Sequence, residues 1–163
     1  MKTQREAPTF YYDGGHRVSL TPDPHRVVID DARTQECLGV SRVRDLHHIG
    51  EELLFGLTLL ARDQLTAIEL EALDHASALH PVFVMDGATI VVLPEVLVSA
   101  PRSLHPQILE MFAEEAHATN QSGENLVMRL VSGRGVDALS VANLLSERWR
   151  NIDVSPNLLR LYS

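Results

Sequence analysis

The chain is poor in cysteine, and its only one, Cys37, excludes a disulfide within the chain. This usage is typical of a reducing compartment, so we expect a cytoplasmic protein. The N-terminus shows no apolar run of the roughly 7–15 residues that a secretory signal contains. No stretch reaches the roughly 20 apolar residues of a membrane span, and the longest, residues 88–100, is interrupted by Pro94 and Glu95. We therefore expect no membrane association.

Cationic residues are also in the minority. The chain has 14 lysines and arginines against 22 acidic residues, which gives a net charge of −8. An acidic surface repels phosphate backbones, and the expected strands of the C-terminal half carry no aromatic pair for stacking bases, so nucleic acid is not an expected partner. Apolar residues make up 45% of the 163 positions, enough for a packed core.

Sequence motifs for catalysis are missing. There is no G-x-S-x-G elbow, and the glycine-rich "SGRGVD" (residues 132–137) lacks the lysine of a phosphate-binding loop. We therefore predict a protein that is not an enzyme and needs no cofactor. The eight histidines leave one alternative open. In "HHIGEE", His47 and Glu51 would share a helix face, although a zinc site also needs further ligands.

Four local signals mark turns and helix starts. The run Asp13–Gly15 and the pair Asp86-Gly87 both predict hairpins between apolar segments. Thr66 and Glu69 form a T-x-x-E capping box, which predicts a helix start. Asp137 is expected to be the N-cap of the last helix. After Pro101 a further helix is expected, with one apolar face made by Leu104, Ile108, Met111 and Phe112.

The order of these elements predicts an α+β fold. Residues 95–163 read strand, helix, short strand, strand, helix, strand, with a separate strand at residues 95–100. That order is typical of the ferredoxin-like split βαβ plan, an antiparallel sheet with two helices on one face. Residues 26–85 admit the same interpretation, so two such units in tandem are expected. The predicted divisions are an N-terminal hairpin or extension at 1–25, a first half at 26–86 and a second at 87–163.

The C-terminal half also resembles a known family. The segments "PVFVMDGATIVVLPEVLVSA", "ENLVMRLVSGRGVDALSVANLLSER" and "IDVSPN" are similar, in this order, to the N-terminal prodomain region of bacterial subtilisin-like serine proteases. The opening "YYDGGHRVSLTPDPHRVVI" resembles the start of the long prodomains of that family. The resemblance covers most of the chain and is weak in residues 30–70. The matching positions are Val82, Phe83, Val96, Val98, Leu126, Met128, Leu130, Ala138, Ala142, Asn143, Leu145, Pro156 and Asn157.

The chain departs from that family at two positions and lacks its catalytic part. Ser155 stands where the family has an acidic residue, and Leu158 stands where it has an aromatic one. The Asp, His-Gly-Thr and Gly-Thr-Ser-Met segments of the protease are absent. The resemblance therefore implies a non-catalytic module, a chaperone-like, inhibitory or regulatory partner of a subtilisin-like serine protease. In such prodomains the sheet packs on surface helices of the protease, and the C-terminal tail enters the substrate cleft as an added strand.

Carried to this sequence, the resemblance implies two kinds of partner-binding residue. Acidic side chains on the sheet-side loops, Glu95 and Glu124, are expected to cap helix N-termini of the partner. The tail is expected to consist of Asn157, Leu158, Leu159, Arg160, Leu161, Tyr162 and Ser163. Three alternatives stay open: the tail is the final strand of the sheet, the chain is an interaction scaffold with no protease partner, or it is a small metal-dependent enzyme using His47 and Glu51.

Overall fold

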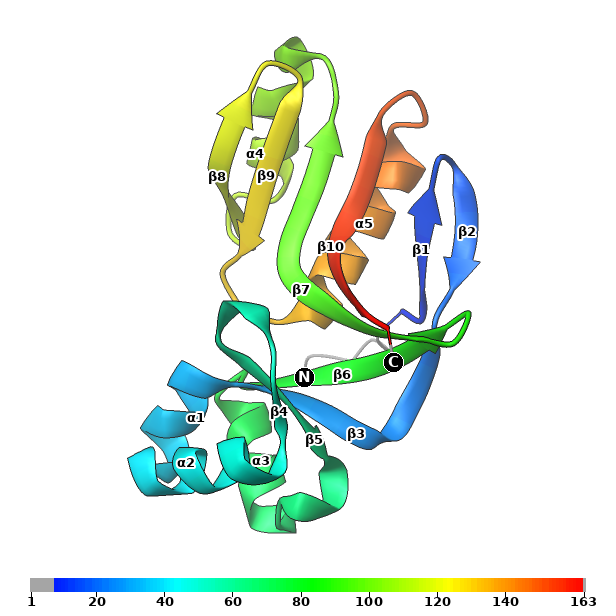
Figure 1. Cartoon of the computed structure of the whole chain (residues 1–163). Helices are drawn as coiled ribbons and strands as arrows, with labels where there is room; N and C mark the ends of the chain where they lie inside the picture. The colour runs from blue at the N-terminus through cyan, green and yellow to red at the C-terminus, as the bar shows by residue number, and fades with distance from the viewer. Residues whose placement is uncertain (1–7, 163) are drawn as a thin grey trace, which may run out of the picture. The chain divides into compact units, whose positions relative to one another are not determined.

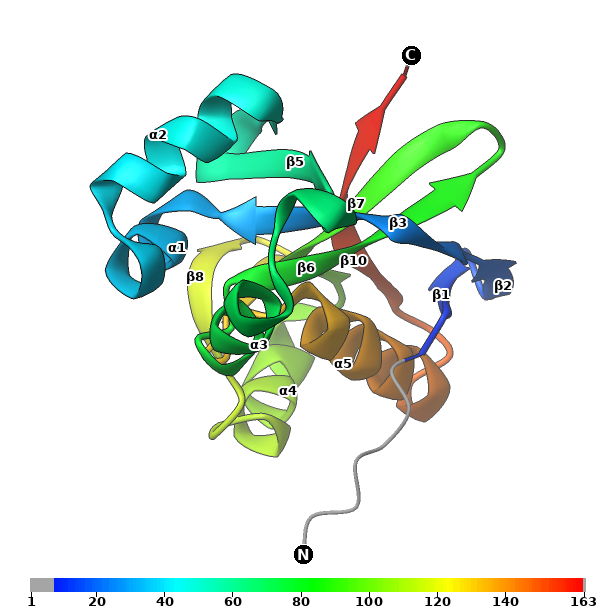
Figure 2. The same ribbon diagram turned by 90° about the horizontal axis from the view of Figure 1, so that it is seen from below.

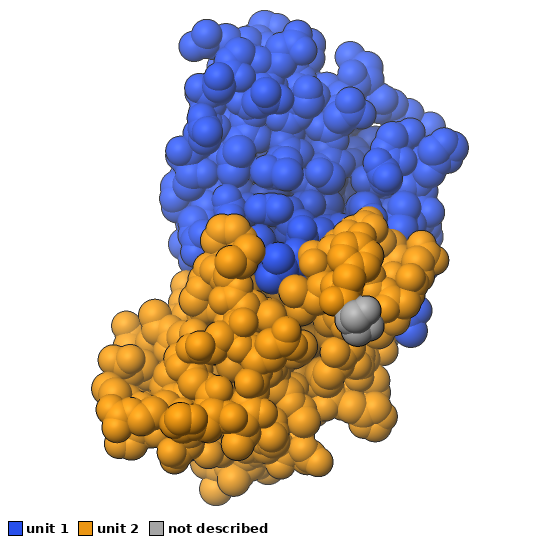
Figure 3. All heavy atoms as spheres, viewed as in Figure 1, with its two compact units in different colours: residues 1–21, 92–159 blue, residues 22–91, 160–163 orange. Residues whose placement is uncertain are grey.

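The computed structural model describes residues 8–162 and contains two compact units. Unit 1 holds the chain up to Thr21 together with Val92–Leu159, and unit 2 holds Pro22–Val91 and the residues from Arg160 onward (Figure 3). The sequence predicts divisions after residues 25 and 86. It does not predict that the N-terminal hairpin belongs to the same compact unit as residues 92–159.

Unit 1 is a sheet with two helices on one face (Figures 1 and 2). Its neighbouring strands follow the order β10-β7-β9-β8, and the β7–β9 and β8–β9 pairs are antiparallel. The predicted N-terminal hairpin is confirmed as a separate two-stranded sheet. The elements are β1 (Phe10–Asp13), β2 (His16–Ser19), β7 (Ala88–Ser99, entering unit 1 at Val92), the 3-10 turn η3 (Arg102–Leu104), α4 (His105–Met111), β8 (Ala116–Ser122), β9 (Asn125–Leu130), α5 (Gly135–Arg148) and β10 (Asp153–Leu161).

Unit 2 combines a second set of strands with three helices. Its strands follow the order β4-β5-β3-β6, and the β3–β5, β4–β5 and β6–β7 pairs are antiparallel. The chain is thus α+β, as the element order predicts. The elements are β3 (Thr21–Asp30), α1 (Asp31–Leu38), α2 (Val40–Ile49), β4 (Glu51–Glu52), η1 (Leu54–Gly56), β5 (Leu57–Ala61), η2 (Arg62–Gln64), α3 (Ala67–His75), β6 (Leu79–Met85) and the first residues of β7.

The expected separate strand at residues 95–100 is wrong, because β7 runs without a break through Pro94. The segment Ala88–Val91 pairs with β6, and Glu95–Ser99 pairs with β9. Pro94 lies between these two ladders, where neither register needs its missing N–H. The expected short strand before the Gly123 turn is longer than predicted, since β8 takes in seven residues.

Two predictions about helices are also wrong in detail. The helix α5 begins at Gly135 with Arg134 as its N-cap residue, so Asp137 lies in the first turn and is not the cap. A carboxylate in the first turn still interacts favourably with the helix dipole. On α4, Met111 is exposed although it was expected on the buried face, because the helix ends there and Phe112 takes the core position.

The capping box of α3 is confirmed, and it forms part of a larger polar cluster. Thr66 Oγ1 accepts a bond from the Glu69 amide at 3.1 Å, while Glu69 Oε1 accepts one from the Thr66 amide at 3.0 Å. Arg42 of α2 holds the same carboxylate with two bonds of 2.7 and 3.0 Å. Chiefly through the hydrogen bond from Arg42, the pKa of Glu69 falls from 4.5 to about 2. The core beneath these helices is formed by Val27, Ile29, Leu46, Leu60, Leu65, Leu73 and Ala78.

This depressed pKa predicts an acid-sensitive contribution to stability. Because the folded value lies below the unfolded one, ionised Glu69 favours the folded state above about pH 5, and this stabilisation is lost as the pH falls towards about 2. The full shift corresponds to about 3 kcal/mol, and partial solvent exposure of the pair reduces the expected figure to about 1–2 kcal/mol. In urea titrations, Glu69→Gln is expected to lose that amount at pH 7 and much less at about pH 3. Glu71→Gln, an exposed change in the same helix, is the control; a pH-independent deficit in Glu69→Gln would contradict the role of the Arg42 pair.

Candidate protein-binding surface

The helices of unit 1 leave one face of its sheet uncovered. Along β7 and β9, side chains alternate strictly between the covered face and the uncovered face. The side chains that pack toward α4 and α5 are buried: Val96, Val98, Leu126, Met128 and Leu130. The side chains that alternate with them are exposed or half-buried, and we call them the open sheet face: Glu95, Leu97, Ser99, Asn125, Val127 and Arg129.

The strand register places these side chains in three cross-strand pairs. Glu95 lies opposite Arg129, and Ser99 lies opposite Asn125. The middle pair is Leu97 with Val127. An apolar centre between a pair of oppositely charged residues and a polar pair has the pattern of a protein interface, which is apolar in the middle and polar at the rim.

The open sheet face borders a cleft of about 500 Å³ within unit 1. Its lining residues come from four places, the β1–β2 hairpin tip and strands β7, β9 and β10: Tyr12, Asp13, Gly14, Leu97, Val98, Ser99, Asn125, Leu126, Val127, Asp153, Val154 and Ser155. The hairpin is fixed to α5, since Asn143 Nδ2 donates to the Phe10 carbonyl at 2.9 Å and the Tyr12 hydroxyl donates to Glu147 at 3.0 Å. The sequence offered no signal that the β1–β2 hairpin lines this cleft, because these contacts join residues more than 130 positions apart.

The two acidic residues expected to meet the partner are not brought together. Glu95 is half-buried on β7 opposite Arg129. Glu124 is exposed in the β8–β9 turn, next to Asn125, which is at the other end of the β9 ladder. Any partner that contacts both carboxylates must therefore span the length of the open sheet face.

The predicted tail is largely a strand. Asn157 to Leu161 belong to β10, which pairs with β7; within this run Arg160 is exposed and the other residues are half-buried. Tyr162 follows the strand and is exposed, and Ser163 lies outside the described residues. The alternative of a final strand, left open from the sequence, therefore describes residues 157–161.

One end of the open sheet face is held by His105, which sequence reasoning did not single out. Its ring is fully buried, and Nε2 lies 3.0 Å from the Ala100 carbonyl and 3.1 Å from the Glu124 carbonyl. Carbonyls only accept, so Nε2 carries the proton and donates to both, while Nδ1 accepts from the Gln121 amide at 2.8 Å. These bonds tie the turn after β7 to the β8–β9 turn. No sequence signal distinguishes this histidine from a surface one.

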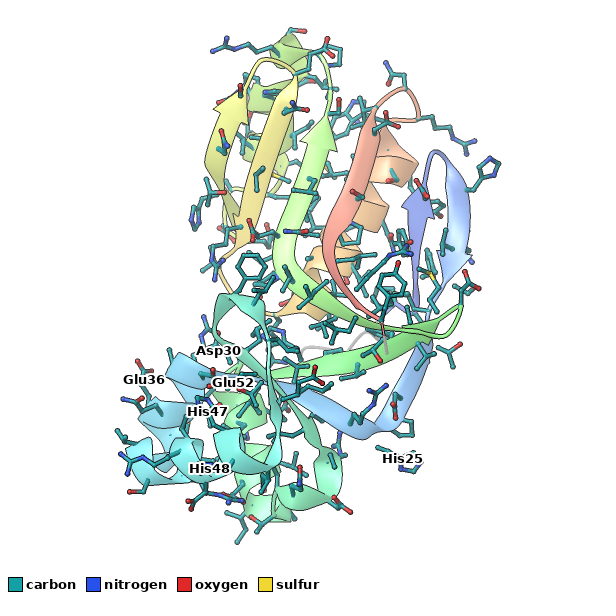
Figure 4. The ribbon with its side chains drawn as sticks, viewed as in Figure 1. His25, Asp30, Glu36, His47, His48 and Glu52 are labelled. Carbon is teal, nitrogen blue, oxygen red and sulfur yellow. The ribbon has the colours of Figure 1, made fainter. Side chains whose placement is uncertain are left out.

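The histidine site expected from "HHIGEE" has a different geometry. The helix α2 ends at Ile49 and Glu51 lies in β4, so the expected helical spacing of His47 and Glu51 is wrong. His47 Nδ1 instead lies 2.9 Å from Glu52 Oε1, and His47 Nε2 lies 3.2 Å from Asp31 Oδ2. Figure 4 shows His25 well apart from His47 and Glu52. Within residues 8–162, no group of three or more His, Cys, Asp or Glu side chains has an arrangement that could hold a metal ion.

Comparisons of the chain with protein-family models, with curated proteins and with solved structures gave no match. The resemblance to subtilase prodomains therefore rests on the residues quoted above. In the described part of the chain, no helix combines the length and the apolar character needed to traverse a bilayer. The fold and the site therefore define a class of protein: an α+β protein of two compact units, in which the helices of unit 1 leave one face of its sheet uncovered.

Proposed function

We propose that this chain is a non-catalytic binding module of the subtilase-prodomain type, which acts on a subtilisin-like serine protease as a folding aid or inhibitor. The observation that carries the proposal is the open sheet face of unit 1, with the Leu97–Val127 pair at its centre. Helices α4 and α5 pack on the other side of the sheet and support it (Figure 1). On the open side, Leu97 is exposed and Val127 is half-buried, so this pair can bury further apolar surface against a partner.

The strand order supports the finer fold assignment that goes with this function. In a split βαβ plan, the first and third strands are central and the fourth and second flank them. In unit 1 the order β10-β7-β9-β8 follows this plan, with α4 and α5 in the two connections. In unit 2 the order β6-β3-β5-β4 follows it as well. Two ferredoxin-like units in tandem are therefore part of the proposal.

Docking of the partner follows from the chemistry of the open sheet face. Leu97 and Val127 bury apolar surface against helices of the protease, which is the favourable term. Glu95 and Glu124, at opposite ends, meet helix N-termini, where a carboxylate is stabilised. Tyr162, which follows β10 and is exposed, contributes the contact at the substrate cleft.

The test is inhibition of purified mature bacterial subtilisins, measured with a chromogenic peptide substrate. Leu97→Asp puts a charge at the centre of the open sheet face and is expected to weaken inhibition at least about 30-fold. The matched control is Leu144→Asp, the same change at an exposed leucine of α5, and it is expected to leave inhibition unchanged.

A second arm separates the sheet from the tail. Removal of Tyr162 and Ser163 leaves β10 intact and is expected to weaken inhibition without changing the stability of the fold. Inhibition that Leu97→Asp leaves at full strength would refute docking through the open sheet face. A folded chain that neither inhibits any of the subtilisins tested nor assists their refolding would favour the alternative of an interaction scaffold with no protease partner.

A further inference from the structure

Unit 1 also has large exposed apolar side chains away from the open sheet face. In its described residues there are four, and Leu97 is the one on the open sheet face. The others are Met111 at the end of α4, Val131 just after β9 and Leu144 on α5, with exposed fractions of 46%, 61% and 42%. Single exposed apolar side chains are normal on a protein surface, so what matters is whether they line a common surface.

Two of these residues line a groove of about 500 Å³ that we call the α5 groove. One wall is a single stripe of α5, because residues separated by three, four and seven positions lie on the same helix face. The other wall is the turn after α4 and the end of β9. The lining residues are Phe112, Glu114, Glu115, Leu130, Val131, Ser132, Asp137, Ser140, Val141 and Leu144.

The charge of the α5 groove is of one sign. Glu114, Glu115 and Asp137 are carboxylates, and none of the described lining residues is a lysine, arginine or histidine. Within residues 8–162, none of these three carboxylates forms an ion pair. The floor is apolar, with Phe112, Leu130 and Val141 beneath the rim. An apolar floor with an acidic rim favours an occupant that is apolar on one side and cationic on the other.

We propose that the α5 groove binds an amphipathic peptide segment of a partner protein, with leucine-like side chains on the floor and lysine or arginine side chains against the rim. Three other classes of occupant fit less well. Nucleic acid and anionic lipid surfaces would bring phosphates against the carboxylates. A second copy of this chain, with its net charge of −8, would be repelled by the same rim.

This inference does not rest on the proposed function. The α5 groove and the open sheet face share no residue. The separation also gives matched variants: Leu144→Asp alters the groove, and Leu97→Asp alters the sheet.

The test begins with a phage-displayed random peptide library selected on the immobilised full chain. Enriched peptides are synthesised with a fluorophore, and their affinity is measured by fluorescence polarisation. We expect sequences in which lysine or arginine alternates with apolar residues, with binding that weakens as salt rises because the rim contacts are ionic. Binding to Leu144→Asp and to the double variant Glu114→Lys/Glu115→Lys is expected to fall at least about tenfold, and binding to Leu97→Asp is expected to stay unchanged.

Several outcomes would overturn the proposal. They are the absence of any enriched peptide, enrichment of acidic or uncharged peptides, and affinities that both groove variants leave unchanged. Sedimentation of the native chain tests whether a second copy of the chain occupies the groove instead. A dimer that Leu144→Asp dissociates would show that it does. If Leu144→Asp fails to fold, Val131→Asp replaces it, since Val131 is the more exposed of the two exposed apolar residues that line the groove.

Discussion

Gly135→Ala is expected to destabilise the protein by at least about 3 kcal/mol, a large part of the roughly 5–15 kcal/mol that holds a domain of this kind together. A Cβ at this position would lie 1.9 Å from the Val92 carbonyl oxygen and 2.8 Å from the Val92 carbonyl carbon. Both obstructing atoms belong to the backbone of β7, so no side chain can rotate away. Either α5 or β7 must move.

The cost of that movement follows from what α5 buries. Its face toward the sheet consists of fully or almost fully buried residues: Ala138, Leu139, Ala142 and Leu145. Lifting the first turn of α5 by the width of a methyl group opens voids beneath these side chains, and the lost contacts add to the steric term. We expect much of the folded population to be lost on mild heating.

Chemical unfolding followed by circular dichroism measures this effect. The control is Gly123→Ala in the β8–β9 turn, where an added Cβ meets nothing within 4 Å. That glycine has a φ of +58°, so alanine there is expected to cost only about 1 kcal/mol of backbone strain. Equal losses in the two variants would mean that the close approach of α5 to β7 does not limit stability.

Gly135 shows why some helix and strand boundaries could be predicted from the sequence and others could not. The Thr66–Glu69 capping box and the Asp86-Gly87 turn are complete within a few residues, so the sequence alone carries their signal. At the start of α5, Gly135 closely approaches the backbone of Val92, more than 40 positions away, and no local signal reveals that approach. Local preferences therefore favoured Asp137 as the cap, and they could not reveal the true boundary.

Part of the candidate binding surface could likewise be predicted from the sequence, and part could not. The alternation that buries Met128 and Leu130 on β9 is visible in the sequence, and with it one side of the sheet. The wall supplied by the N-terminal hairpin depends on the Asn143 and Tyr12 bonds, and the α5 groove depends on where α4 ends. Such features need the tertiary structure, because each joins segments with no shared pattern in the sequence.

His105→Ala is expected to cost about 3–5 kcal/mol, comparable with deleting a large buried side chain. The substitution leaves a cavity in place of a fully buried ring. It also leaves the carbonyls of Ala100 and Glu124 without their side-chain donor and the Gln121 amide without its acceptor. Loss of its donor by the buried Ala100 carbonyl costs about 1–3 kcal/mol. The Glu124 carbonyl keeps its bond from the Ala100 amide, and the exposed Gln121 side chain can turn to water, so these two losses are smaller.

Two further variants separate the cavity from the hydrogen bonds, and the outcome bears on the open sheet face. His105→Leu fills most of the volume but cannot donate, so a loss of about 2 kcal/mol or more is expected to persist. His117→Leu, an exposed change on β8, is the control. Because the His105 bonds join the two turns beside the Ser99–Asn125 pair, amide exchange at Asn125 is expected to accelerate in both His105 variants. If His105→Leu matches His117→Leu in stability and exchange, the ring only fills volume, and the rigidity of the open sheet face must come from the strand ladder itself.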